Sequence, residues 1–212
     1  MEFTISAIIG YVFGSLPTAY VLLKRKGIDI TKSGSGNVGA YNSLEVTKSK
    51  LTGFIVFAVD FSKGVLSVLS VKYLFGNQFE FQITALLFAV FSHCYSPWLK
   101  FKGGKGLATG AGGTIILMPV ILGLWILFWI FVYLYKKNIQ VANSAASGLV
   151  GLLAFFTSDI LNKYSNPPAT NNNFFGWMTL ILFLVILTKH IIPLKEYFLE
   201  QQNLTRKKHE HI

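Results

Sequence analysis

Residues 107–135 read LATGAGGTIILMPVILGLWILFWIFVYLY, one long apolar run. An α-helix crosses a bilayer with about 20 apolar residues. The run is therefore longer than one span and shorter than two ordinary spans. Proline removes a hydrogen bond from a helix interior, so we expect two short helices that turn near Pro119. Whether this run crosses the membrane once or twice decides the topology of the whole chain.

The other apolar segments each suit one span. They are residues 4 to about 23, 51–75, 79–99, 141–156 and 174–188. Of the 212 residues, 52% are hydrophobic and 13% are charged, whereas soluble chains carry about 25% charge. A chain this apolar could not cover its own surface in water. We therefore expect an all-α polytopic membrane protein, folded as a single domain over 1–212, with a frayed polar tail at about 200–212.

Positive charge decides how often the 107–135 run crosses. Of the 19 lysines and arginines, 16 fall in four clusters, at 24–50, 100–105, 136–137 and 189–208. Cytoplasmic loops carry an excess of these residues. All four clusters lie on one side only if the run crosses twice. This predicts seven transmembrane helices, with the amino terminus outside and the carboxyl terminus inside. The net charge of +10 then reflects loops that face anionic membrane lipids rather than nucleic acid.

A glycine-rich loop follows the first span, Gly34-Ser35-Gly36-Asn37-Val38-Gly39-Ala40-Tyr41-Asn42. Its glycines permit backbone conformations that other residues avoid. Successive backbone N–H groups in such a loop can bind an anion, and the serine and asparagine side chains add hydrogen-bonding groups. Taken alone, a Gly-Ser-Gly motif is more typical of an ordinary flexible loop.

A second glycine-rich segment is basic, Lys100-Phe101-Lys102-Gly103-Gly104-Lys105-Gly106, and precedes Ala108-Thr109. Glycines at a helix entrance leave N–H groups and the helix dipole free to face phosphate, and lysine supplies charge. The spacing is not that of a Walker A loop. The alternative is a basic loop that touches lipid headgroups.

Three ionisable residues, Asp60, Lys63 and His93, lie within or near the predicted spans. Such residues are costly in a membrane and by default indicate a functional site. Asp60 and Lys63 are three residues apart and share a helix face, so a structural ion pair is the alternative. A lone histidine is more often a structural hydrogen-bond partner than a catalyst. The sequence holds no Cys/His metal cluster, and we expect neither a metal nor another cofactor.

Together these three segments resemble the bacterial acyl-phosphate:glycerol-3-phosphate acyltransferase family, the PlsY type, most strongly over about residues 10–112. The resemblance implies a seven-span enzyme of the bacterial plasma membrane. Members of this family transfer a fatty acyl group from acyl-phosphate to the 1-hydroxyl of glycerol 3-phosphate. The products are lysophosphatidic acid, which enters phospholipid synthesis, and phosphate. The resemblance implies no acyl-CoA and no metal, and it leaves the oligomeric state open.

The resemblance also implies roles for individual residues. Ser35, His93 and His190 match catalytic positions. The expected substrate-binding residues lie mostly in the two glycine-rich segments: Gly34, Gly36, Asn37, Gly39, Asn42, Lys63, Lys102, Gly103, Gly104, Lys105, Gly106 and Thr109. Residues 102–106 would hold glycerol phosphate, and the first loop would lie near the reacting carbonyl.

The chain departs from the family pattern at several positions. Tyr41 replaces a threonine, Glu45 replaces an arginine expected to contact phosphate, and Pro193 replaces the asparagine of a late His-x-x-Asn element. The region near Gln140 lacks the usual serine. Two other functions therefore stay open. One is a diverged, non-catalytic homologue with a regulatory or lipid-binding role, and the other is a small transporter that uses the intramembrane charges.

Overall fold

The computed structural model describes residues 1–210, and the side chains of all of these except 204, 205 and 207–210. Over this range all regular secondary structure is helical, without a strand. The elements are α1 (Glu2–Ser15), α2 (Thr18–Lys24), η1 (Ile30–Lys32), α3 (Ala40–Thr47), α4 (Lys50–Phe75), α5 (Phe79–Cys94), η2 (Pro97–Leu99), α6 (Leu107–Leu117), α7 (Pro119–Lys136), α8 (Ile139–Phe156), α9 (Ser158–Leu161), η3 (Asn162–Tyr164), α10 (Asn172–Thr188) and α11 (Ile191–Glu210). The all-α prediction is confirmed for the described residues.

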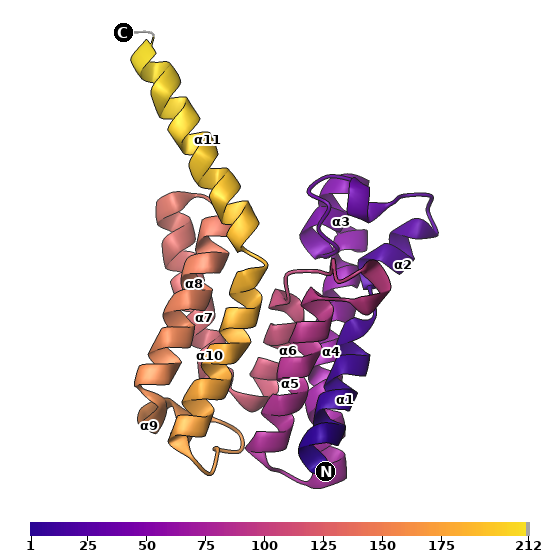
Figure 1. Ribbon diagram of the computed structural model, residues 1–212, viewed down its shortest axis with the longest axis vertical. Helices are drawn as coiled ribbons and strands as arrows, with labels where there is room; N and C mark the ends of the chain where they lie inside the picture. Colours follow the sequence, from indigo (N-terminus) through magenta and orange to yellow (C-terminus); the bar gives the residue numbers. More distant parts are fainter. Residues whose placement is uncertain (211–212) are drawn as a thin grey trace.

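Most of the long helices run side by side in one bundle, and α11 projects from one end of it (Figure 1). The segment Glu2–Lys24 and helices α4, α7 and α8 are each long and apolar enough to cross a membrane. Helices α10 and α11 form a pair bent by 53°, which adds a fifth candidate if the pair is one span. The remaining apolar helices are shorter.

The 107–135 run breaks where its proline predicts. Helix α6 ends at Leu117 and α7 begins at Pro119, while Met118 between them takes the non-helical dihedral angles φ −141° and ψ 63°. Proline has no N–H, but the first residues of a helix have no partner for theirs, so it begins α7 at little cost. The expectation of two helices in this run is confirmed.

Other predicted boundaries shift. The first apolar segment is interrupted between α1 and α2, because Pro17 cannot donate a helical hydrogen bond. Helix α5 ends at Cys94 rather than near residue 99, and Pro97 begins the short turn η2. The tail expected to fray at about 200–212 is helical through Glu210, and residues 211–212 lie outside the described part of the chain.

Small residues bring the helices into backbone contact. A Cβ added to Gly14 of α1 would overlap the carbonyl oxygen of Ala89 in α5. A Cβ added to Gly64 of α4 would overlap the carbonyl oxygen of Thr109 in α6. Close approach at small residues is how membrane helices pack without a hydrophobic driving force between them. The first contact joins α1 to α5 and the second joins α4 to α6. Helix α4 also packs against α1 and α5, so these four helices form one group.

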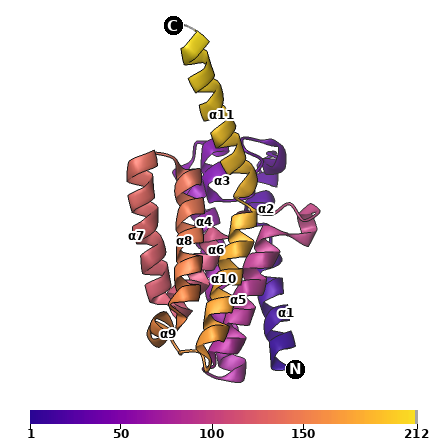
Figure 2. The same ribbon diagram turned by 60° about the vertical axis from the view of Figure 1, so that its left-hand side comes forward.

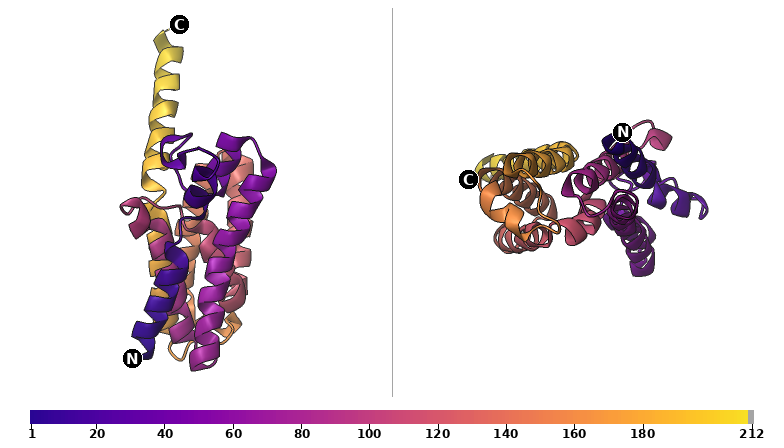
Figure 3. Two further views of the ribbon diagram at one scale, coloured as in Figure 1. Left: turned by 90° about the vertical axis from the view of Figure 1, so that its right-hand side faces the viewer. Right: turned by 90° about the horizontal axis from the view of Figure 1, so that it is seen from below.

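Helices α7, α8 and α10 form a second group beside the first (Figures 2 and 3). Buried apolar residues fill the junction between the groups, among them Phe79, Ile83 and Leu86 of α5 and Phe175 and Leu182 of α10. The two groups therefore meet along α5 and α10, and space for a ligand can remain only where this packing opens.

We expect Gly14→Ala to lower the melting temperature of the protein in detergent, because its methyl group would overlap the Ala89 carbonyl. Overpacking of this kind costs about 1–3 kcal/mol. Gly123→Ala is the matched control, since an added Cβ there meets no atom within 4 Å. Unfolding can be followed with a thiol-reactive dye, because Cys94 is fully buried. Equal melting temperatures for the two variants would contradict the close contact of α1 with α5.

Candidate active site

A cavity of about 350 Å³ lies between the two helix groups, bordered by the start of α3. One part of its wall is polar and includes Ser35, Asn37, Asn42, Asp60, His93, Lys105, Gln140 and Asn143. The other part is mainly apolar and includes Phe57, Leu107, Ala108, Ala111, Leu122, Trp125, Ile139, Leu182, Phe183 and Ile186. A molecule with a polar head and an apolar tail fits such a wall.

Asn42 shapes the first glycine-rich loop. Its side-chain nitrogen donates to the carbonyl oxygens of Ser33 and Asn37, at 3.0 and 2.9 Å. Its side-chain oxygen accepts from the Ser35 N–H at 3.0 Å. Both amide hydrogens are therefore used within the loop. Asn42 holds Ser35 at the cavity, and the substrate-binding role expected for Asn42 itself stays a prediction.

The glycines of this loop occupy positions that a side chain would disturb. Gly34 and Gly36 have φ values of 58° and 68°, in the left-handed region that favours glycine. Gly39 lines the cavity and caps the amino end of α3. Unpaired N–H groups and the positive end of the helix dipole at such a position favour an anion.

Lys105 brings a cation to the cavity wall. Its Nζ donates to Oε1 of Gln140 at 2.6 Å. Burial lowers the pKa of the Lys105 ammonium, and the carboxylate of Glu196 opposes this by raising it. Gly106, at φ 80°, follows in the wall and caps α6. Because Gln140 is neutral, it orients the ammonium without cancelling its charge, so this end of the cavity can receive an anion.

His190 is buried in the turn between α10 and α11. Its Nδ1 lies 2.9 Å from the carbonyl oxygen of Ile186. A carbonyl only accepts, so Nδ1 carries the hydrogen and Nε2 has the lone pair. Nε2 is buried and has no hydrogen-bond partner in the described part of the chain. Burial lowers the pKa of His190 to about 4, and the charge of Lys105 acts in the same direction. His190 is thus a neutral imidazole with an unused acceptor, although it does not line the cavity.

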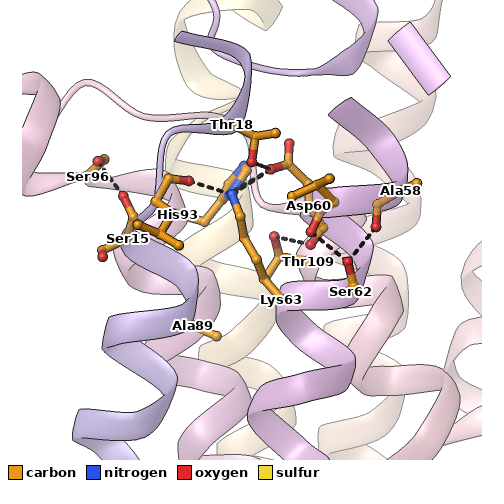
Figure 4. Close-up of polar contacts among 12 residues, drawn as sticks. Ser15, Thr18, Ala58, Asp60, Ser62, Lys63, Ala89, His93, Ser96 and Thr109 are labelled. Atoms are coloured by element: carbon orange, nitrogen blue, oxygen red, sulfur yellow. Dashed lines mark hydrogen bonds and ion pairs between the residues drawn. The ribbon is translucent and has the colours of Figure 1, made fainter. Parts of the chain in front are cut away.

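Asp60, Lys63 and His93 meet at the cavity wall (Figure 4). Oδ1 of Asp60 accepts from Lys63 Nζ at 2.6 Å and from Thr18 Oγ1 at 2.9 Å, and Nδ1 of His93 lies 3.9 Å from the same oxygen. Lys63 Nζ also donates to the carbonyl oxygen of Leu16 at 2.5 Å. Buried charges require such partners. Asp60 and His93 reach the cavity, while Lys63 stays behind them.

Gly103 and Gly104 support His93 from behind. Their N–H groups donate to the carbonyl oxygens of Cys94 and His93, at 3.1 and 3.0 Å. A Cβ added to Gly104 would overlap Nε2 of His93. These glycines therefore allow the basic segment to pack against the histidine, and neither is part of the cavity wall.

The structure divides the residues that the motifs indicate into two sets. Those in the cavity wall are Ser35, Asn37, Gly39, Asn42, His93, Lys105 and Gly106. Those outside it are Gly34, Gly36, Lys63, Lys102, Gly103, Gly104, Thr109 and His190. In the second set, Thr109 is buried and donates to the backbone oxygen of Asp60 at 2.9 Å, and Lys102 is exposed. Substrate binding by this set stays a prediction.

Helix α8 contributes polar residues that the sequence analysis did not assign to a site. Gln140 and Asn143 line the cavity. The indole N–H groups of Trp129 and Trp125 donate to Asn143 Oδ1 at 2.7 Å and Ser147 Oγ at 3.0 Å. The sequence did carry a signal for these site residues, namely polar residues at helical spacing within an apolar segment. Such residues face the interior of a helix bundle.

The departures from the family pattern lie in different surroundings. Tyr41 borders the cavity, whereas Glu45 is exposed on α3 and does not line it. Pro193 stands in the first turn of α11, where a missing N–H breaks no helical hydrogen bond.

We expect Asp60→Asn to destabilise the protein in detergent, because it leaves the Lys63 ammonium buried without its carboxylate. Breaking one side of a buried ion pair costs about 3–5 kcal/mol. Adding Lys63→Met removes the stranded charge, so the double variant should recover most of the lost melting temperature. If Asp60→Asn alone is as stable as the unmodified protein, the buried Lys63 ammonium does not need the Asp60 carboxylate as its partner.

The family model for "Glycerol-3-phosphate acyltransferase" matches residues 4–198 of the chain. The chain is 32% identical over 198 residues to the glycerol-3-phosphate acyltransferase of Helicobacter acinonychis (strain Sheeba), covering 88% of this chain and 87% of that one. It is 40% identical over 157 residues to the glycerol-3-phosphate acyltransferase of Pelagibacter ubique (strain HTCC1062), covering 72% and 76%.

Two solved structures have the same fold. One is the crystal structure of PlsY (YgiH), an integral membrane glycerol 3-phosphate acyltransferase, in its glycerol 3-phosphate form, with a TM-score of 0.76, 27% sequence identity and 94% of each chain covered. The other is the lysophosphatidic acid form of PlsY, with a TM-score of 0.75 and 27% identity, covering 94% of this chain and 93% of that one.

Proposed function

The chain belongs to the glycerol-3-phosphate acyltransferase family, and we propose that its cavity holds both substrates of the reaction. The protein is an integral membrane enzyme that acylates glycerol 3-phosphate in membrane phospholipid synthesis.

The observation that carries the proposal is the division of the cavity wall into a cationic end and an apolar arm. At one end are Lys105 and the amino end of α3, both suited to phosphate. The apolar arm begins beside them with Leu107 and Ala108 and continues to Leu122 and Trp125. An acyl phosphate has a phosphate head and a long apolar tail, and it matches this wall. The acceptor, glycerol 3-phosphate, is small and anionic.

The chemistry requires one bond to form and one to break. The 1-hydroxyl oxygen of glycerol 3-phosphate attacks the carbonyl carbon of the acyl phosphate. The bond between that carbon and the phosphate oxygen breaks, and inorganic phosphate leaves with the hydroxyl proton. Lysophosphatidic acid remains. Because acyl phosphate is already activated, positioning and charge neutralisation supply most of the rate.

The residues of the site take separate roles in this proposal. Lys105, oriented by Gln140, binds the phosphate of the acceptor. Ser35 lies near the reacting carbonyl and is held there by Asn42. His93, in the last turn of α5, orients the reacting groups. His190 lies outside the cavity wall with a buried, unused acceptor at Nε2, and its catalytic role stays a prediction.

Seven spans best explain the arrangement. They are α1 with α2, α4, α5, α6, α7, α8 and α10. The Asn166 N–H donates to the Leu117 carbonyl at 2.8 Å, which favours a turn between α6 and α7 at the end opposite Lys105. The lysine clusters then face the cytoplasm, beside the cavity mouth, and the amino terminus lies outside the plasma membrane of a bacterium. The chain forms one catalytic domain.

The activity itself can be measured as phosphate release from palmitoyl phosphate in the presence of glycerol 3-phosphate, with purified protein in detergent. Release that requires both substrates, with lysophosphatidic acid as the lipid product, would support the proposal. Absence of release from folded protein would favour the non-catalytic homologue, and transport of a solute without acyl transfer would favour the transporter.

We expect Lys105→Ala to raise the KM for glycerol 3-phosphate by about 10- to 150-fold, because a charge-assisted hydrogen bond contributes about 1.5–3 kcal/mol. Lys136→Ala is the matched control, since Lys136 is an exposed lysine at the end of α7 and does not line the cavity. Unchanged kinetics of Lys105→Ala with both substrates would show that Lys105 does not bind the acceptor.

Cysteine labelling in intact cells tests the topology. Ser35→Cys and Lys137→Cys should resist a membrane-impermeant thiol reagent, whereas Asn166→Cys should react, because the first two face the cytoplasm in the seven-span arrangement. Cys94 is buried and stays in place. Equal labelling of positions 137 and 166 from outside would exclude seven spans.

A further inference from the structure

The basic segment that follows α5 divides into an inward and an outward part. Lys105 turns inward to the cavity and Gln140. Residues 96–102 form a compact turn, which we call the 96–102 hairpin, and its two lysines, Lys100 and Lys102, are exposed. The reaction proposed above uses the inward part and leaves the hairpin without a function.

The hairpin presents aromatic rings together with its lysines. The side chains of Trp98 and Phe101 are 67% and 62% exposed. Lys100 and Phe101 have φ values of 51° and 62°, in the left-handed region that residues with side chains seldom adopt. Two such residues in succession cost backbone energy, and a strained backbone of this kind points to a role for the groups that it displays.

Hydrogen bonds hold the hairpin and its exposed side chains in a defined conformation. Ser96 Oγ donates to the carbonyl oxygen of Ser15 at 2.8 Å, and Trp98 Nε1 approaches Ser15 Oγ at 3.3 Å. Within the turn, the Phe101 N–H donates to the Ser96 carbonyl oxygen at 2.9 Å. Figures 2 and 3 show the turn, coloured as residues near 100, standing out sideways from the bundle near α1 and α2. It therefore projects away from the bundle on the side of α1 and α2.

The chemistry of the hairpin fits a charged lipid surface. Tryptophan rings concentrate at the boundary between headgroups and acyl chains, and lysines near a membrane surface are attracted to acidic lipids. Neither Lys100 nor Lys102 takes part in an ion pair with the described residues. We propose that the 96–102 hairpin docks onto acidic phospholipid headgroups of the leaflet beside the cavity.

Docking of the hairpin would affect the active site through the backbone that connects the two. The hairpin runs directly into Gly103 and Gly104, whose N–H groups bind the carbonyl oxygens of Cys94 and His93. Lipid that holds the hairpin holds the peptide behind His93 as well. The docked lipid is a component of the bilayer and is distinct from either substrate.

The depth of the hairpin in a bilayer tests the proposal without relying on enzyme activity. Phe101→Cys carries a nitroxide label in protein reconstituted into phosphatidylcholine bilayers, with and without one third phosphatidylglycerol. Collision rates with oxygen and with a water-soluble nickel complex report the depth. We expect the label to lie at the headgroup boundary and to move deeper when phosphatidylglycerol is present. A label at Glu45→Cys, on the exposed face of α3, serves as the aqueous reference.

Lys100→Gln and Lys48→Gln form a matched pair in the labelled background. Both lysines are exposed and both have left-handed backbone, with φ values of 51° and 52°, so the same substitution carries the same backbone strain. Lys100→Gln should abolish the shift caused by phosphatidylglycerol, and Lys48→Gln should keep it. Melting temperatures equal to that of the parent exclude misfolding as the cause.

Three results would overturn the proposal. The first is a label at position 101 as accessible to nickel as the label at position 45. The second is a phosphatidylglycerol shift that Lys100→Gln and Lys48→Gln affect equally. The third is a shift of the same size on adding glycerol 3-phosphate to pure phosphatidylcholine bilayers, which would assign the lysines to the substrate.

Discussion

The buried ion pair between Asp60 and Lys63 holds the cavity wall together. The chain breaks at Pro17 between α1 and α2, so the carbonyl oxygen of Leu16 lies outside both helices. It accepts from the Thr18 N–H at 3.1 Å and from the Lys63 ammonium. A charge in a low-dielectric interior must be paired, so the position of α4 relative to the break is constrained. Oδ1 of Asp60 also accepts one hydrogen bond from Thr18 Oγ1 and lies 3.9 Å from Nδ1 of His93. One pair of charges thus connects three segments that are distant in the sequence.

Glycine serves two different purposes in the site. In the first loop, Gly34 and Gly36 need the left-handed backbone that turns the chain around Asn42. In the basic segment, Gly103 and Gly104 need room, because the peptide lies directly against His93. Both pairs of glycines position side chains for a ligand. Gly103 and Gly104 do so although neither lines the cavity. A motif that looks like one phosphate-binding loop therefore combines a histidine support, one inward lysine and an outward hairpin.

The cavity separates charge from apolar surface within a short distance. Gln140 is uncharged, so it does not neutralise the Lys105 ammonium that it binds, and the apolar part of the wall begins close by in the chain with Leu107 and Ala108. Exclusion of water from the apolar part of the cavity lowers the local dielectric constant, which strengthens electrostatic interactions at the cationic end. An activated acyl donor needs little more than this arrangement, because the reacting groups must chiefly be aligned and their charge neutralised.

The sequence by itself determined the all-helical membrane character, the break at Pro119 and the motifs that indicate the family. Hydropathy and the missing N–H of proline are local properties, so they can be read along the chain. The sequence could not show where α5 ends, nor that the side chains of Lys105 and Lys102 face in opposite directions. Those outcomes depend on contacts between distant segments, as between Lys105 and Gln140. Only the tertiary structure brings such partners together, because burial of each side chain is decided by the helix that packs against it.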